Sequence, residues 1–192
     1  MRKAFFPVGL NLEGKLCVVI GGVEDREAIE KTASLAEAGA DVRRLTDPRA
    51  VSEDSVRDAF FVISTPQDAT LSKRLRELAD RHRFLLCCID QPAFGFVAMA
   101  AIAKAGPVRV AISTTGLAPR VGKILKEALQ KAMDARFARF VERLGTKREQ
   151  TRAEYPSAHQ SETRRAAAIE AAEGFSANVT FEYPDWLDDV ER

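Results

Sequence analysis

Two short polar segments, each directly after an apolar run, carry the side chains best suited to chemistry. Asp90 closes the run at 84–89, and a hydroxyl-rich turn closes the run at 108–112. A carboxylate in such a place can accept a proton, and hydroxyls and N–H groups at a helix start can hold an anion. The simpler interpretations are a turn-forming aspartate and a helix N-cap without a ligand. The turn comprises Ser113, Thr114, Thr115 and Gly116.

A pair of glycines after the first apolar run forms a second candidate site. Gly21 and Gly22 follow Lys15–Ile20, where the backbone N–H groups of a strand-to-helix turn can bind the diphosphate of a dinucleotide. The usual third glycine is missing, so a tight turn without a ligand stays an alternative. The positions that would hold it are occupied by Val23, Glu24 and Asp25.

Asp47 and Pro48 follow the second predicted strand, at 41–45. A carboxylate at this place can bind the ribose of a dinucleotide. An Asp-Pro pair is equally natural in a turn, so both interpretations stay open.

Histidines and cysteines offer little for a metal. His82 and His159 are the only histidines and lie far apart in polar surroundings, which excludes a preformed histidine-rich metal site and predicts two surface residues. The three cysteines fit no zinc spacing and lie within apolar runs, as buried thiols do. They are Cys17, Cys87 and Cys88.

The elements that must position these groups alternate between strands and helices. Helical spacing of apolar residues runs from Glu24 to Ala38 and from Leu71 to His82, and the short apolar runs between them read as buried strands. Short connections then predict right-handed crossovers and an α/β fold with a doubly wound parallel sheet of the Rossmann-like kind. The predicted strands are 15–20, 41–45, 59–64, 84–89 and 108–112.

The chain after the last strand is predicted to be helical. One long helix from Pro119 to Leu144 keeps an apolar face for about seven turns, too long to pack on a small sheet alone, which predicts a homodimer. An alanine-rich helix at 166–172 belongs to a small C-terminal subdomain. We therefore expect a nucleotide-type domain at 1–112, an active-site loop and dimerisation helix at 113–146, and a helical subdomain at 147–192.

Composition narrows the class of protein. With 46% hydrophobic residues, the 192-residue chain can bury one substantial core. Its 29 basic residues nearly balance 28 acidic ones, so overall charge gives no reason to expect nucleic acid or an anionic membrane as partner. Since no apolar stretch approaches a membrane span or a signal peptide, a cytoplasmic protein is predicted.

Charge is nevertheless uneven along the second half. From Arg120 to Arg165 there are 12 Lys and Arg against 6 Asp and Glu, whereas from Glu170 to Arg192 there are 7 acidic residues and 1 basic one. The basic stretch could attract a polycarboxylate, and a solvated helix face explains it more simply.

The order of these features resembles the siroheme-synthase N-terminal family, over most of the chain. The segment Phe6–Lys15 is similar to the residues that precede the first strand in this family. Val19–Gly22 looks like the family's glycine loop, and Leu35–Val42 looks like the end of the helix that follows this loop. More specific is the pair Ile89-Asp90-Gln91-Pro92 and Ala111-Ile112-Ser113-Thr114-Thr115-Gly116-Leu117-Ala118-Pro119, similar to the family's "V-D-x-P" and "A-I-S-T-x-G-x-S-P".

The resemblance implies an activity and assigns residues to it. It implies oxidation of precorrin-2 to sirohydrochlorin with NAD, followed by insertion of Fe²⁺ as a substrate, with Asp90 on the family's catalytic aspartate and Thr114 in its active-site region. The turn at 113–116 with Arg120 and Lys123 would then meet the substrate's carboxylates, in one pocket with Asp90. Residues near the family's NAD-contacting loops are Gly21, Gly22, Val23, Glu24, Asp25, Asp47 and Pro48.

Two departures from the family pattern leave other functions open. The glycine loop and helix start, Val23–Lys31, are about two residues longer than in the family, and the segment between 45 and 60 is shorter, which predicts a smaller or rebuilt sheet. One alternative is a sirohydrochlorin chelatase or tetrapyrrole-binding protein without dehydrogenase activity. Another is a dimeric regulatory module that senses NAD or a tetrapyrrole.

Overall fold

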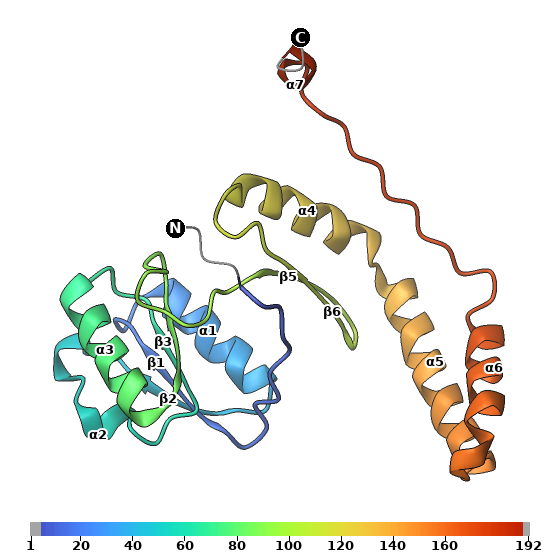
Figure 1. Cartoon of the computed structure of the whole chain (residues 1–192), viewed down its shortest axis with the longest axis horizontal. Coiled ribbons are helices and arrows are strands. Elements are labelled where there is room, and N and C mark those ends of the chain that lie inside the picture. Colours follow the sequence, from blue (N-terminus) through green and yellow to red (C-terminus); the bar gives the residue numbers. More distant parts are fainter. Residues whose placement is uncertain (1–4, 190–192) are drawn as a thin grey trace. The chain divides into compact units, whose positions relative to one another are not determined.

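Four parallel strands form the central sheet of the computed structural model, which describes residues 5–189. They are β1 (Leu16–Ile20), β2 (Asp41–Leu45), β3 (Phe61–Ser64) and β4 (Leu85–Cys88), in the order β2-β1-β3-β4 (Figure 1). All four were predicted, and β1, β3 and β4 were predicted from their apolar runs. Because β1 lies between β2 and β3, the connections leave it in both directions, which confirms the Rossmann-like α/β fold.

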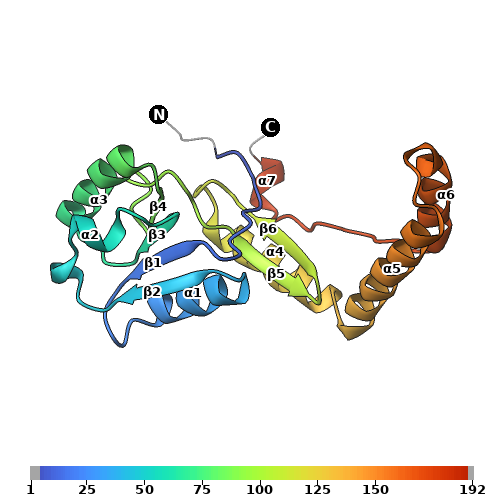
Figure 2. The same ribbon diagram turned by 90° about the horizontal axis from the view of Figure 1, so that it is seen from below.

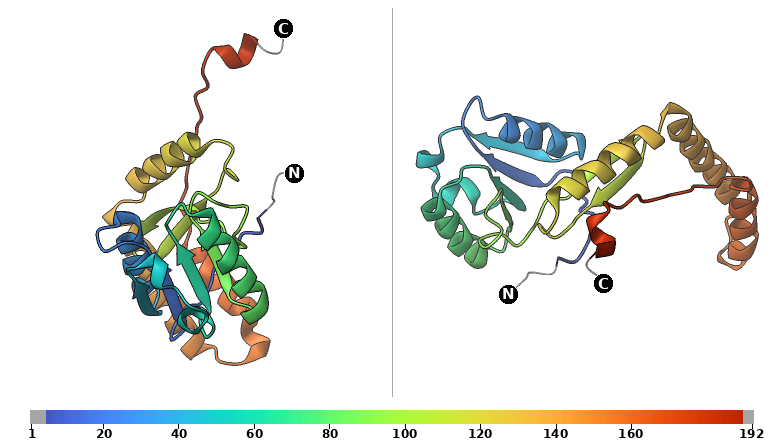
Figure 3. Two further views of the ribbon diagram at one scale, coloured as in Figure 1. Left: turned by 90° about the vertical axis from the view of Figure 1, so that its left-hand side faces the viewer. Right: turned by 90° about the horizontal axis from the view of Figure 1, so that it is seen from above.

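Helices cover both faces of this sheet. Alternate residues of β1 point to opposite sides: Cys17 and Val19 pack with α1 (Arg26–Glu37), and Val18 and Ile20 pack with the other face. That second face is covered by α2 (Glu53–Val56) and α3 (Ala69–His82). Figure 3 shows the strands between α1 and α3.

The connection between β2 and β3 is helical. It holds the short 3₁₀ helix η1 (Pro48–Ala50) and α2, and no strand. Val51 and Val56 from this connection are buried in the core under α3. The short segment noted in the sequence therefore produces a sheet of four strands.

The predicted strand at 108–112 forms but does not extend the parallel sheet. It is β6 (Val108–Ile112), which pairs only with β5 (Ala101–Ala105) in a separate two-stranded sheet. The two-residue connection Gly106-Pro107, with Gly106 at φ +51°, is too short for a parallel crossover. The prediction of a fifth parallel strand was wrong, and β5 was not predicted.

The expected long helix is two helices. These are α4 (Pro119–Ala132) and α5 (Ala135–Glu154). Asp134 interrupts them: its backbone is extended, and its side chain accepts a hydrogen bond of 2.8 Å from the N–H of Phe137, the N-cap arrangement. A new helix therefore starts at residue 135, so the prediction of one continuous helix was wrong.

The chain divides into two compact units. One reaches to Ile102 and includes Ala111–Lys126, and the other comprises Ala103–Val110 and the chain from Glu127 on. In the second unit α5 packs against α6 (Ser161–Ala171), which follows the 3₁₀ helix η2 (Ala158–Gln160); Figure 2 shows the two helices side by side. The last element is α7 (Trp186–Asp189). Within residues 5–189, no helix is both long enough and apolar enough to cross a bilayer.

Candidate active site

The carboxyl ends of the four parallel strands meet at one edge of the sheet. In the register of the sheet, Ile20 lies beside Leu45 and Ser64, and Ser64 lies beside Cys88. The loops that follow these strands are therefore neighbours. Open α/β sheets bind their ligands at this edge.

Gly21 is required by close packing at this edge. A methyl group added to it would lie 2.4 Å from Thr65 Oγ1, 2.6 Å from Ala28 Cβ and 2.8 Å from Asp25 Oδ2. No real Cβ tolerates such distances, so the absence of a side chain lets α1 and the end of β3 approach β1 closely. This is the packing role expected of a glycine in a dinucleotide turn.

Gly22, in contrast, faces open space. A methyl group added there would meet no atom within 4 Å. The next two residues, Val23 and Glu24, are exposed. The backbone from Gly22 to Glu24 is thus accessible to a ligand.

Asp25 occupies the start of α1. Its Oδ1 accepts hydrogen bonds from the N–H groups of Glu27 (3.0 Å) and Ala28 (3.1 Å), and its Oδ2 lies 2.5 Å from Thr65 Oγ1. The hydrogen bond from Thr65, more than those from the backbone, holds the pKa of Asp25 below its ordinary value. A charged carboxylate therefore already engages two first-turn N–H groups that could otherwise face an anion.

Arg44 is a residue of this edge that the sequence did not single out. From β2 its Nη2 donates to the carbonyl oxygens of Gly22 (2.5 Å) and Val23 (3.1 Å), so it holds the glycine loop from outside. Its Nε is buried and, within the described part of the chain, makes no hydrogen bond. The available signal was a cation near the end of the second strand, where a residue can contact the ribose or a ribose phosphate.

These observations fit a bound dinucleotide at the glycine loop. The close-packed Gly21 and the open Gly22 match two of the three glycine roles, and Arg44 supplies a positive charge beside the loop. The backbone of Gly22–Glu24 would hold the diphosphate. When bound, NAD supplies the acceptor for a hydride.

Asp90 projects from the turn after β4. Its backbone is left-handed (φ +56°), and its side chain is exposed. Gln67, from the loop after the neighbouring strand β3, donates from Nε2 to Asp90 Oδ2 at 3.3 Å. This amide orients the carboxylate at the predicted sheet edge.

The hydroxyl-rich turn starts α4. Thr114 Oγ1 accepts a hydrogen bond of 3.4 Å from the N–H of Ala118, and Ser113 Oγ accepts one of 3.2 Å from the N–H of Thr115. Thr115 and Gly116 have left-handed backbones (φ +52° and +78°). The hydroxyls therefore make local hydrogen bonds within the turn that precedes α4, and a shared pocket with Asp90 stays a prediction. Arg120 and Lys123 are exposed on α4.

The other candidates make local contacts. Asp47 accepts a hydrogen bond of 2.9 Å from the N–H of Arg49 and so caps η1, beginning with Pro48, as an Asp-Pro turn does. Its binding to a ribose stays a prediction. His159 is exposed, whereas His82, expected at the surface, is half-buried with Nε2 2.5 Å from Glu53 Oε1.

The cysteines lie in the interior of the protein. All three cysteines are buried, and burial raises the pKa of Cys87 to about 12. Within residues 5–189, no three His, Cys, Asp or Glu side chains are grouped so that they could hold a metal ion. A macrocycle that brings its own nitrogen ligands would not need such a group.

The chain is similar in sequence and in fold to known proteins. Residues 8–101 match the sequence model of a family described as "Putative NAD(P)-binding". The precorrin-2 dehydrogenase of Bacillus subtilis (strain 168) is 28% identical over 156 residues, which cover 72% of this chain and 94% of that protein. A solved structure named SirC, precorrin-2 dehydrogenase, shares the fold with a TM-score of 0.66 at 18% identity, covering 88% of this chain and 90% of that one.

Longer relatives match as well. The siroheme synthase of Xylella fastidiosa (strain M12) is 29% identical over 172 residues, which are 81% of this chain and 36% of that protein. The chain therefore spans about a third of the length of the curated siroheme synthases that it matches.

Proposed function

We propose, from the premise that residues 8–101 make this chain a member of the NAD(P)-binding family, that it oxidises precorrin-2 to sirohydrochlorin with NAD⁺. The observation that carries the proposal is the position of Asp90. Its carboxylate, held by Gln67, lies at the sheet edge that also bears the glycine loop. Precorrin-2 dehydrogenases and siroheme synthases among the relatives support this choice of substrate.

The oxidation removes two electrons and two hydrogens from the macrocycle. One hydrogen leaves as a hydride to NAD⁺, and the other leaves as a proton. Asp90 accepts this proton on its carboxylate and, because the side chain is exposed, passes it to solvent. Gln67 fixes the direction of the accepting oxygens and is a positioning residue.

The carboxylates of the tetrapyrrole need cations and N–H groups. Arg120 and Lys123 on α4 and the turn at 113–116 are the proposed partners. The left-handed Thr115 and Gly116 turn their backbone away from helical geometry just before α4 begins.

Iron insertion is a second step that the same residues could support. The macrocycle supplies four nitrogen ligands to the substrate Fe²⁺, and two pyrrole protons must leave. Asp90 would accept them, so one carboxylate serves both reactions. We also propose that the protein acts as a homodimer; its cytoplasmic location stays a prediction.

One observation favours a chelatase without dehydrogenase activity. Asp25 places a negative charge at the start of α1 and engages two N–H groups there. Calorimetric titration with NAD⁺ separates the two functions. Absence of binding at millimolar NAD⁺, together with intact iron insertion, would leave only the chelatase.

The variant Asp90→Asn tests the proposed role. Asparagine keeps the size and tolerates the left-handed backbone, so the fold should persist. We expect the rate of sirohydrochlorin formation from precorrin-2, followed by absorbance, to fall by about 10²–10⁴ with unchanged NAD⁺ affinity.

The matched control is Asp58→Asn. Asp58 is exposed and precedes β3, so it lies toward the opposite end of that strand from Gln67. Its substitution should leave both rate and affinity unchanged. Full activity of Asp90→Asn would refute a catalytic role for this carboxylate.

A further inference from the structure

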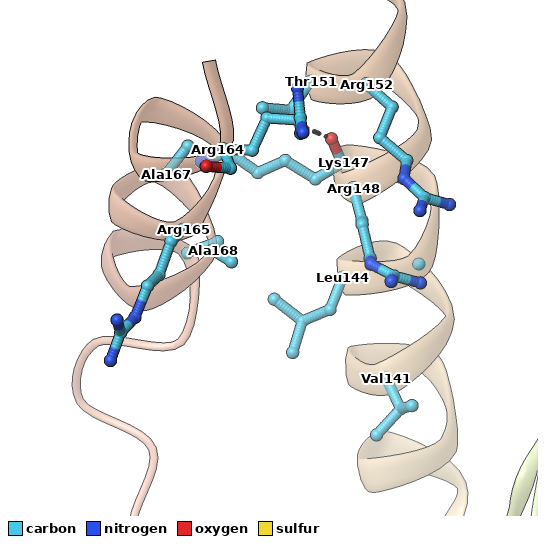
Figure 4. Close-up of a pocket in the computed structure, with 13 residues that line it drawn as sticks. Val141, Leu144, Lys147, Arg148, Thr151, Arg152, Arg164, Arg165, Ala167 and Ala168 are labelled. Carbon is cyan, nitrogen blue, oxygen red and sulfur yellow. Dashed lines mark hydrogen bonds between the residues drawn. The ribbon is translucent and has the colours of Figure 1, made fainter. Parts of the chain in front are cut away.

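A groove with an apolar floor and a basic rim lies between α5 and α6. Its volume is about 510 Å³. Figure 4 shows Leu144 of α5 and Ala168 of α6 on the two walls of this groove; Arg148, Arg152 and Arg165 line it as well, with their guanidinium groups directed outward. The apolar lining residues are Val141, Leu144, Ala167, Ala168 and Ala171, and the basic ones are Lys147, Arg148, Arg152, Arg164 and Arg165.

The basic rim is not neutralised from within the groove. Of the described residues that line it, none is acidic. Arg164 donates to the carbonyl oxygens of Tyr155 (2.7 Å) and Ser157 (2.6 Å) and so supports η2, whereas Arg148, Arg152 and Arg165 are exposed. A complementary occupant must be acidic and carry large apolar side chains.

The segment after α6, here called the tail (residues 176–187), has that composition. It is almost entirely without helix or strand and exposes large apolar side chains, among them Phe181 (58%), Tyr183 (69%) and Trp186 (63%). Acidic residues Glu182 and Asp185 alternate with these rings. Aromatic side chains spaced along an extended segment are typical of an arm that packs on another surface.

We propose that the tail of one copy of this protein lies in the α5–α6 groove of a second copy. The carboxylates of Glu182 and Asp185 meet the guanidinium groups of Arg148 and Arg152, and the rings cover the Leu144 floor. This inference rests on the homodimer proposed above and is independent of the redox and chelation chemistry.

The length of the tail suffices for this contact. Twelve extended residues reach about 40 Å, whereas the part of α5 that lines the groove, from Val141 to Arg152, spans about 17 Å at the helical rise of about 1.5 Å. The tail can therefore line the whole groove and still leave several residues to bridge two copies.

The direction of the tail favours a second copy over its own groove. Phe175 stacks on Phe140 (5.1 Å between ring centroids) and lies 6.0 Å from Phe137, near the amino end of α5. The basic rim lies toward the carboxyl end of α5. Figures 1 and 3 show the tail leaving α6 in the direction away from the helix pair.

Trp186, the single tryptophan of the chain, reports on the contact. In the full-length protein we expect its emission to move to shorter wavelength and its quenching by acrylamide to decrease as protein concentration rises. The groove variant Arg148→Glu/Arg152→Glu and the tail variant Glu182→Lys/Asp185→Lys should each abolish this change. Each should raise the dimer dissociation constant, measured by analytical ultracentrifugation, about tenfold.

Mixing the two variants separates docking on a second copy from docking within one chain. Each tail then meets an oppositely charged groove only on the other variant, so an equimolar mixture should regain Trp186 protection and dimer affinity. If each variant alone loses the protection of Trp186 from acrylamide and the mixture does not regain it, the proposal is wrong. The proposal is also wrong if the emission of Trp186 in the parent protein does not change with concentration.

A matched control uses the same helix. Arg139→Glu/Arg143→Glu changes the same charge at the same spacing on α5, outside the groove, and should behave like the parent protein. Equal loss of Trp186 protection in this control would refute the groove as the docking site. If the variants stay dimeric while Trp186 is exposed at every concentration, the homodimer stands and the tail contact is wrong.

Discussion

The substitution Gly21→Ala tests whether the start of α1 is locked against β1 and β3. The added methyl would lie under 3 Å from three atoms, and one of them, Ala28 Cβ, is fixed to the first turn of α1 and cannot rotate away. Overpacking of this kind costs about 3 kcal/mol. For a chain of this length, that corresponds to a fall in Tm of roughly 6–12 °C.

The partner substitution Gly22→Ala separates packing from binding. A methyl there meets no atom within 4 Å, so Tm should not change. Because the methyl fills the space through which a diphosphate approaches the backbone, we expect the Kd for NAD⁺ to rise about tenfold, or about 1.4 kcal/mol.

Differential scanning calorimetry and isothermal titration with NAD⁺ measure the two effects. A Tm of Gly21→Ala within about 2 °C of the parent would refute the locked packing. Unchanged NAD⁺ affinity of Gly22→Ala would show that the diphosphate does not approach this loop.

Three further outcomes are expected. Thr65→Val removes the main cause of the low pKa of Asp25 and should lower stability by about 1 kcal/mol at neutral pH. A carboxylate whose pKa is lowered in the folded state stabilises the fold at pH values above that pKa. The difference in unfolding free energy between parent and variant, measured by urea unfolding, should therefore shrink as pH falls through the folded-state pKa of Asp25. Arg44→Met frees the glycine loop and should raise the Kd for NAD⁺ several-fold in calorimetry while helices and sheet persist by circular dichroism. Since all three thiols are buried and the pKa of Cys87 is about 12, Ellman's reagent at pH 8 should label none in the native protein and all three after unfolding.

Most of the central sheet could be predicted from the sequence because three of its strands, β1, β3 and β4, are buried on both faces. A run such as Cys17–Ile20 has no polar residue, and glycine or a helix cap follows at the point where the strand ends. The same reasoning located Asp90 and the glycine loop, since loops after parallel strands meet at one edge.

Other features depend on contacts that a local pattern does not contain. The run at 108–112 alternates half-buried and exposed residues, as a hairpin strand does, but its apolar content also suits a parallel strand. Asp134 lies within an otherwise continuous apolar periodicity, and only its bond to the N–H of Phe137 identifies it as a cap. The role of Arg44 arises because β2 lies beside the glycine loop.

The carboxylate of Asp25 changes how this edge can bind an anion. Where a third glycine would leave the helix N-terminus free, Asp25 reaches it and engages the N–H groups of Glu27 and Ala28. A diphosphate must therefore be met by the backbone before the helix, from Gly22 to Glu24, with the negative charge of Asp25 nearby. Arg44, bound to the carbonyls of this same stretch, places a positive charge beside it that offsets the charge of Asp25.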